Sequence, residues 1–272
     1  MSVAVEQPRT RPPGILRAPQ VSLGQAWSYW LRNWAIFKHT YRLSLLAWFI
    51  EPVIYLVAMG FGLGEYLQQV RGVEYVDFIA PGLVALSVMY GATFETTWNA
   101  FFKMERAKIY DACVSAPLSP EDVALGEAMW AATRAMIYGG AFIVIALPFG
   151  VFHSWWGLAV PFALGLVGLM FSIMGLSFTY WISMVDYLSY YWTLFLTPMF
   201  MFSGIFFPLD RLPGWVQAFS WCMPLRHSVD LMRALLVDGD PAAAAGAALW
   251  VVVVTAALFV VPLNLLQRRL VK

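Results

Sequence analysis

The chain has 272 residues, of which 61% are hydrophobic, 17% are aromatic and 12% are charged. Ordinary soluble domains carry roughly a quarter charged residues, so this composition excludes a water-soluble fold of the usual kind. The formal net charge of +1 and the scatter of the basic residues along the chain exclude a nucleic-acid binder.

The N-terminal part of the chain predicts two segments before the first crossing. Residues 1–21 are rich in proline and arginine without the apolar stretch of a signal peptide, which indicates a disordered cytoplasmic tail. In residues 22–42, Trp27, Trp30 and Trp34 recur at helical spacing and predict an amphipathic helix. Such a helix suits the membrane surface, where indole rings lie at headgroup level, and it also suits a protein interface. Both alternatives remain open from the sequence.

The rest of the chain, residues 43–272, predicts an all-α polytopic membrane protein with six transmembrane helices. Each predicted span is near the length of about 20 residues that crosses the hydrocarbon core. The predicted spans cover residues 43–64, 78–101, 128–149, 157–183, 190–207 and 243–266. With both termini placed in the cytoplasm, 12 Lys and Arg residues lie inside and 4 lie outside. The positive-inside rule therefore favours a multi-pass protein of the bacterial cytoplasmic membrane with both termini inside.

Two connecting segments are longer than simple turns. The inner one, residues 103–127, predicts a short helix followed by a second helix that Ser119 caps and that Pro120 begins. The outer one, residues 208–240, alternates helix breakers with short apolar runs and predicts re-entrant or interfacial helices before the last span. Within it, Arg226, Asp230 and Arg233 are spaced for ion pairing on a helix.

Charged residues inside predicted spans are costly, which makes them candidates for function. Glu51, Glu95 and Arg134 lie at similar depth in the first three spans, so they are expected to form a charge network in which one arginine neutralises two carboxylates. A structural ion pair and a role toward a substrate or a proton are both compatible with this placement.

Aromatic residues gather in the first and fifth spans. They could bind a substrate along a path or form the interfacial belt that aromatic residues form at both membrane surfaces. The candidates for a substrate path are Trp48, Phe49, Tyr55, Tyr190, Tyr191, Trp192 and Phe195.

The sequence contains no nucleotide-binding loop, no zinc-protease motif and no nucleophile elbow. Cys113 and Cys222 lie in different segments without metal-ligand spacing, so neither a metal site nor a catalytic residue is expected. Energy for uphill transport would therefore come from an ion gradient or from a separate ATPase chain.

Four stretches carry a resemblance to a known family. They read FIAPGLVALSVMYGATFETTW at residues 78–98, SPEDVALGE at 119–127, FSGIFFPLDRLPGW at 202–215 and MPLRHSVDLMRALL at 223–236. With the order of the segments, these stretches resemble the permease subunit of type-2 ABC exporters. They are most similar to the nodulation-factor branch, which exports lipo-chitin oligosaccharides. The resemblance covers nearly all of the chain from residue 22 onward.

The resemblance implies an assembly and a mechanism. Two copies of the chain would form a homodimer in the membrane lipid, and two ABC ATPase subunits would bind ATP and Mg and drive export of an amphiphile such as a lipo-oligosaccharide, a polysaccharide or a lipid. The short inner helix would couple to the ATPase. The coupling residues would be Arg106, Lys108, Ile109, Tyr110 and Val114.

Two alternatives remain beside the ATP-driven exporter. An ion-gradient-driven secondary transporter is favoured by the intramembrane carboxylates but lacks evident inverted repeats. A multispan membrane enzyme would need a polar catalytic constellation, which the sequence does not offer.

Overall fold

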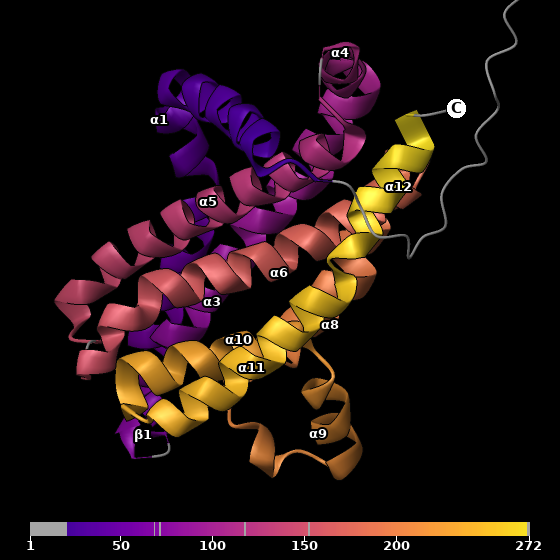
Figure 1. The fold of residues 1–272 in the computed structure, drawn as a ribbon. Helices are drawn as coiled ribbons and strands as arrows, with labels where there is room; N and C mark the ends of the chain where they lie inside the picture. Colours follow the sequence, from indigo (N-terminus) through magenta and orange to yellow (C-terminus); the bar gives the residue numbers. More distant parts are fainter. Residues whose placement is uncertain (1–20, 68, 71, 117, 152, 271–272) are drawn as a thin grey trace, which may run out of the picture.

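The computed structural model describes residues 21–67, 69–70, 72–116, 118–151 and 153–270, and at residues 42–49, 51, 61 and 65 it describes the backbone alone. The tail predicted for residues 1–21 therefore lies outside the described residues except for its last position. The described chain is a helical bundle with one small ribbon, in which β1 (Gln69–Val70) pairs antiparallel with β2 (Val73–Glu74). Figure 1 shows α4 and the end of α12 at one end of the bundle, and β1 and α9 at the other.

The first helix, α1 (Leu23–Gly62), joins the predicted amphipathic helix and the first predicted span into one continuous element. In Figure 1 its indigo ribbon first crosses one end of the bundle and then turns along it. The early part lies against α5, where the backbone of Ala26 approaches Gly126 closely. The later part lies against α3, with Gly60 beside Val76. The short α2 (Gly64–Leu67) leads into the ribbon.

The helix α3 (Tyr75–Phe94) is the centre of the bundle, because α1, α5, α6 and α10 all pack on it. Nearly every one of its side chains is buried, which its continuous apolar sequence allows. It continues as two π-helical segments, η1 (Glu95–Asn99) and η2 (Phe102–Arg106). Hydroxyl groups of Thr96 and Thr97 donate to backbone carbonyls one turn earlier, so their polarity is satisfied inside the bundle.

The inner segment folds as predicted into a short helix, α4 (Ile109–Ser115), and a long one, α5 (Pro120–Ala146). The predicted cap is confirmed: the N–H of Asp122 donates to Ser119 Oγ over 3.1 Å, and the N–H of Ser119 donates to the Asp122 carboxylate over 3.2 Å. The same carboxylate accepts from the N–H of Ser22 over 2.6 Å, which ties the start of α1 to the start of α5.

The helix α6 (Val160–Trp181) runs back beside α5 (Figure 1). The two are joined through the short 3₁₀ turns η3 (Leu147–Phe149) and η4 (Trp155–Ala159). Gly168 lies against Ala132 and Ala135, and small residues of this kind allow helices in membranes to approach closely. Gly175 lies against Thr96, which brings α6 next to η1.

The remaining elements follow in chain order. They are α7 (Asp186–Tyr190), the π-helical η5 (Tyr191–Leu196), α8 (Thr197–Met201), the 3₁₀ turn η6 (Leu209–Arg211), α9 (Gly214–Trp221), α10 (Pro224–Arg233), the π-helical η7 (Ala234–Asp238), α11 (Pro241–Leu258) and α12 (Val260–Leu270). The outer segment, residues 208–240, thus consists of short helices between the fifth and sixth predicted spans. Its predicted ion pairs form: Asp230 lies 3.7 Å from Arg226 and 3.8 Å from Arg233.

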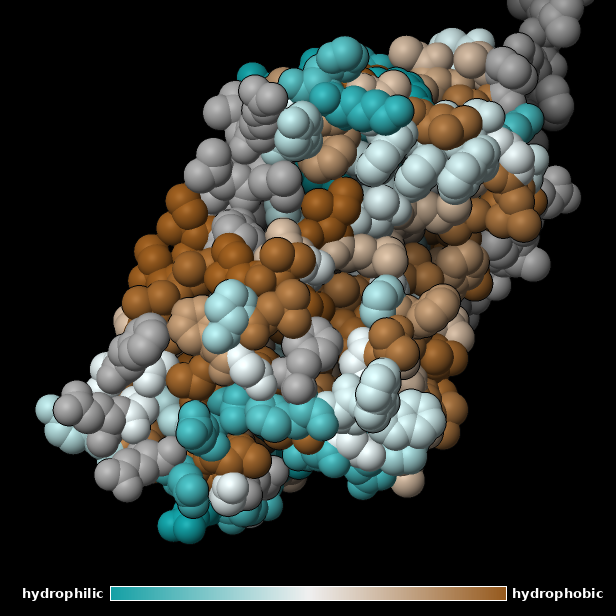
Figure 2. Space-filling model, turned by 90° about the vertical axis from the view of Figure 1, so that its left-hand side faces the viewer, coloured by the Kyte–Doolittle hydropathy of each residue, from teal (hydrophilic) through white to brown (hydrophobic). Residues whose placement is uncertain are grey.

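Four helical stretches in the described part of the chain are long and apolar enough to cross a membrane: Tyr75–Arg106, Pro120–Phe149, Trp155–Trp181 and Pro241–Leu270. They correspond to the second, third, fourth and sixth predicted spans. The first predicted span is the later part of α1. The fifth is broken into α7, η5 and α8. Figure 2 shows hydrophobic residues gathering in a band across the middle of one face, with hydrophilic residues above and below.

Candidate functional site

A group of buried charged residues lies at the end of the bundle that carries α4. Its centre is Glu95 in η1, whose side chain is 2% exposed. This carboxylate pairs with the guanidinium of Arg134 from α5 and with Lys103 Nζ, 2.7 Å away in η2. Trp130 Nε1 and Asn99 Nδ2 donate to it over 3.0 and 2.7 Å. Glu95 is therefore fully ion-paired and hydrogen-bonded, as a buried carboxylate requires.

The charges continue toward α1. Lys103 Nζ lies 2.6 Å from a carboxylate oxygen of Glu127, whose side chain is completely buried. The other oxygen of Glu127 accepts a hydrogen bond of 2.5 Å from the hydroxyl of Tyr29 in α1. We call this series of contacts the polar ladder. Its members, in spatial order, are Arg134, Glu95, Lys103, Glu127 and Tyr29. It connects α5, η1, η2 and α1.

Arg134 is held by aromatic rings as well as by Glu95. Its guanidinium lies 5.6 Å from the ring centroid of Phe37 and 5.3 Å from that of Tyr138, and it also donates to the Tyr138 hydroxyl. Cation–π contacts of this kind are stronger where water is excluded. The Arg134 end of the polar ladder is thus fixed between α1 and α5.

The Tyr29 end of the polar ladder reaches α4 through three tyrosines. The Tyr110 ring lies 6.4 Å from the Tyr29 ring and 6.1 Å from the Tyr180 ring, both in edge-to-face geometry. Burial raises the pKa of the Tyr29 hydroxyl, and the neighbouring Glu127 carboxylate raises that pKa further. Burial likewise raises the pKa of Tyr110. Both hydroxyls therefore stay protonated and available as donors.

The predicted coupling residues lie in α4 or directly before it and divide into two groups. Arg106 and Lys108 are exposed, and Ile109 and Val114 are half-buried, so these four can contribute to a surface. Tyr110 is 0% exposed. Its prediction as a docking residue needs correction: a side chain enclosed by Tyr29 and Tyr180 cannot touch a partner, and it instead fixes α4 to the bundle.

The backbone at the start of α4 has an unusual conformation. Lys108 adopts a left-handed conformation with φ of 51°, the only positive φ of a non-glycine residue in the described chain. Such a conformation costs free energy and occurs at turns and functional positions. The Lys108 ammonium lies 3.6 Å from Glu105 and 4.0 Å from Asp111, on the exposed side of the turn. It projects from the junction between η2 and α4.

The predicted charge network is brought together in part. Glu95 and Arg134 are in contact, while the side chain of Glu51 lies outside the described residues. Lys103 and Glu127, which complete the ladder, were interpreted from sequence as members of the inner connecting segment. The signal that could have found them is the continuation of the span-two helix beyond residue 101.

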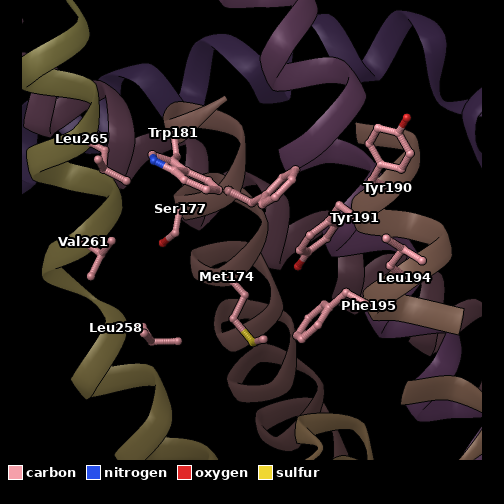
Figure 3. A pocket seen from close by; sticks show the side chains of 11 residues that line it. Met174, Ser177, Trp181, Tyr190, Tyr191, Leu194, Phe195, Leu258, Val261 and Leu265 are labelled. Carbon is pink, nitrogen blue, oxygen red and sulfur yellow. The ribbon is translucent and has the colours of Figure 1, made fainter. Parts of the chain in front are cut away.

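The predicted aromatic residues that the structure describes lie in three places. Tyr190, Tyr191 and Phe195 line a groove of about 650 Å³ between α6, η5 and α12, seen from close by in Figure 3. Trp192 lies elsewhere: its ring is 5.8 Å from Tyr90, and its indole N–H donates to Thr97 over 3.2 Å.

The aromatic candidates of the first span also lie apart from this groove. Tyr55 packs on Phe200 and Phe206, with ring centroids 5.7 and 5.8 Å away. The side chains of Trp48 and Phe49 lie outside the described residues. Among the described residues, no three His, Cys, Asp or Glu side chains are grouped to hold a metal ion.

The fold and this site define a helical membrane protein in which a short surface helix is fixed to the spanning helices by a buried polar ladder. Comparison with known families identifies it further. The chain belongs to the ABC-2 type transporter family, which matches residues 24–237. It is a membrane-spanning ABC transporter subunit.

Individual relatives place the chain within that family. Nodulation protein J of Rhizobium leguminosarum bv. trifolii is 40% identical over 214 residues, covering 78% of this chain and 80% of the relative. Nodulation protein J of Sinorhizobium fredii strain NGR234 is 38% identical over 246 residues, covering 89% and 92%. The inner membrane transport permease YadH of Escherichia coli is 26% identical over 209 residues, covering 76% and 80%. The chain is thus an ABC-2 permease of the nodulation protein J branch.

Proposed function

We propose that this chain is the permease of an ATP-driven exporter in the bacterial inner membrane, in which two copies form the path and two ABC ATPase chains bind ATP and Mg. The observation that supports this most directly is the packing of α4 against the rest of the bundle. Arg106 and Lys108 are exposed just before α4, and Tyr110 of α4 packs on Tyr29 of the polar ladder, which enters the spanning helices. Movement of a partner against α4 would therefore act on η2, η1 and α5 together.

The proposed topology has six crossings with both termini in the cytoplasm. The later part of α1, residues 43–62, would make the first crossing, since 20 residues of helix extend about 30 Å. The fifth crossing would use α7, η5 and α8 with the extended chain after them. The excess of basic residues at the α4 end supports placing that end in the cytoplasm.

The proposed substrate is an amphiphile such as a lipo-oligosaccharide. The support is the similarity to the nodulation protein J relatives. An ion-gradient mechanism is less well supported, because Glu95 is ion-paired with two cations, Lys103 and Arg134. A carboxylate that carries a proton through a cycle needs to lose such partners.

Charge reversal at the junction between η2 and α4 tests the proposal. Arg106→Glu and Lys108→Glu should each reduce co-purification of the ATPase several-fold. If the complex still assembles, the reconstituted variants should hydrolyse ATP while export falls several-fold. Arg211→Glu is the matched control, because Arg211 is also exposed but lies in the outer segment. Normal co-purification of the ATPase, with normal ATP hydrolysis and normal export, in both the Arg106→Glu and the Lys108→Glu variant would contradict the coupling role. Failure of the wild-type chain to co-purify with any ATPase would contradict the exporter itself.

A further inference from the structure

The groove in Figure 3, here called the aromatic groove, is almost entirely apolar and opens on the outside of the bundle. Figure 3 shows Met174, Ser177 and Trp181 of α6 in the middle of the groove. Leu258, Val261 and Leu265 lie on one side of it, and Tyr190, Tyr191 and Phe195 lie on the other. A cleft of this composition in the membrane region suits a hydrocarbon chain, which gains dispersion contacts there without losing hydrogen bonds.

One polar group inside the aromatic groove has no partner. The Tyr191 side chain is 7% exposed, and its hydroxyl has no hydrogen-bond partner in the part of the chain that the structure describes. Figure 3 shows this hydroxyl pointing into the groove toward Met174. A buried hydroxyl without a partner costs free energy, so a ligand that brings an acceptor to this position would relieve that cost. An ester carbonyl beside a hydrocarbon chain is such an acceptor.

The aromatic groove continues into a second cavity of about 620 Å³, here called the basic pocket, because Trp181 and Leu265 line both. The basic pocket carries Lys108, Arg268 and Arg269 against the acidic Glu105 and Asp111.

The charges of the basic pocket leave an excess of cationic groups. Arg269 pairs with Glu105 over 2.7 Å and donates to the carbonyls of Thr179 and Tyr180 at the end of α6. Its position is therefore fixed. Lys108 lies 3.6 Å from Glu105 and 4.0 Å from Asp111, so the lining holds three basic residues against two acidic ones, a net positive charge that suits a phosphate group.

Trp181 marks the boundary between the two cavities. Its side chain is 72% exposed, as is typical of indole rings at the level of lipid headgroups. On one side of Trp181 the aromatic groove is lined by apolar side chains, and on the other side the basic pocket is lined by charged ones. This order matches a lipid molecule, whose acyl chain, ester and phosphate follow one another in the same direction.

We propose that the aromatic groove and the basic pocket together form a binding site for one anionic membrane phospholipid, with an acyl chain in the groove, an ester near the Tyr191 hydroxyl and the phosphate in the basic pocket. The proposal does not depend on the proposed export function. Since Lys108 and Asp111 belong to the pocket, the lipid would lie directly against the start of α4.

Native mass spectrometry of the full chain, titrated with phosphatidylglycerol or with phosphatidylcholine of the same acyl chains, tests the proposal. We expect one phosphatidylglycerol to be retained at energies that remove phosphatidylcholine. Arg268→Gln should weaken phosphatidylglycerol binding, while Arg211→Gln, a matched change at the other end of the molecule, should leave it unchanged. Equal retention of the two lipids would overturn the proposal.

Two further variants test the groove itself. Tyr191→Phe should weaken phosphatidylglycerol binding about three- to tenfold, the effect of one lost hydrogen bond. It should not lower the melting temperature without lipid, because the hydroxyl has no partner among the described residues. Val261→Trp should fill the groove and abolish binding, whereas Val253→Trp, an exposed position on α11, should not. If Val261→Trp fails to fold, unaltered binding by both Tyr191→Phe and Arg268→Gln would still refute the site.

Discussion

Glu95 holds two cations in the interior of the bundle. The predicted pairing of Glu95 with Arg134 is confirmed, the side chain of Glu51 lies outside the described residues, and Lys103 is a second cation on Glu95 that the prediction did not include. Lys103 then carries the charge onward to Glu127. Removal of Glu95 would therefore leave two buried cations competing for the remaining acceptors, and removal of Arg134 would leave Glu95 still paired with Lys103.

This asymmetry gives a prediction for stability. Glu95→Gln should lower the free energy of unfolding by about 3–5 kcal/mol, the range for breaking a buried ion pair by removing one partner. Arg134→Met should cost less, because Glu95 keeps Lys103, Trp130 and Asn99 as partners. Denaturation of the detergent-solubilised variants measures both. The double variant should be less destabilised than the sum of the singles, and strict additivity would show that the two residues do not interact.

The sequence could indicate part of this site and not the rest, for a geometric reason. Glu95 and Arg134 stand out because charges are rare inside apolar spans. Lys103 does not, because an α-helix would place it about 80° around the axis from Glu95, eight residues earlier. The π-helical segments η1 and η2 widen the turns between the two residues and bring them to one side. No helical periodicity in the sequence predicts that change.

At the scale of elements, the junction of α1 and α5 shows what short sequence signals do predict. Ser119 and Pro120 indicated the start of α5, and the capping box between Ser119 and Asp122 confirms it. The second bond of Asp122, to the N–H of Ser22, joins residues 100 positions apart and could not be predicted. The continuity of α1 was also missed, since the composition changes near residue 43 while the helix does not end.

Gly126 provides a test of this junction. A Cβ added there would lie 2.7 Å from the Ala26 carbonyl oxygen and 2.9 Å from Tyr29, so α1 would have to move away from α5. Gly126→Ala should therefore destabilise the protein by about 1–3 kcal/mol, the usual cost of overpacking. Gly140→Ala in the same helix is the control, because nothing lies within 4 Å of the added atom. It should be neutral or should stabilise α5 by up to about 1 kcal/mol through helix propensity. Equal melting temperatures for the two variants would show that the approach of Ala26 to Gly126 is not tight.

At the scale of the whole molecule, the two ends of the bundle differ in chemistry. One end carries α4, the polar ladder and the end of α12, and the other carries the ribbon and α9 (Figure 1). Composition and apolar length sufficed to predict the helical membrane class and the four stretches that are long enough to cross. The proposed fifth crossing, by α7, η5 and α8, is not one of these four, because π-helical turns and Pro198 divide it into short elements.

The sidedness of these two ends can be measured with cysteine labelling. In a Cys222→Ser background, Gln69→Cys in the exposed ribbon should react with a membrane-impermeant maleimide on intact cells, and Cys113 in α4 should not. After permeabilisation Cys113 should react slowly. Burial raises the pKa of its thiol, so less thiolate is present at neutral pH and the labelling rate should keep rising as the pH is raised toward that pKa. Labelling of Cys113 on intact cells, or a disulfide between Cys113 and Cys222 within one wild-type chain, would contradict the placement of α4 and the outer segment on opposite sides of the membrane.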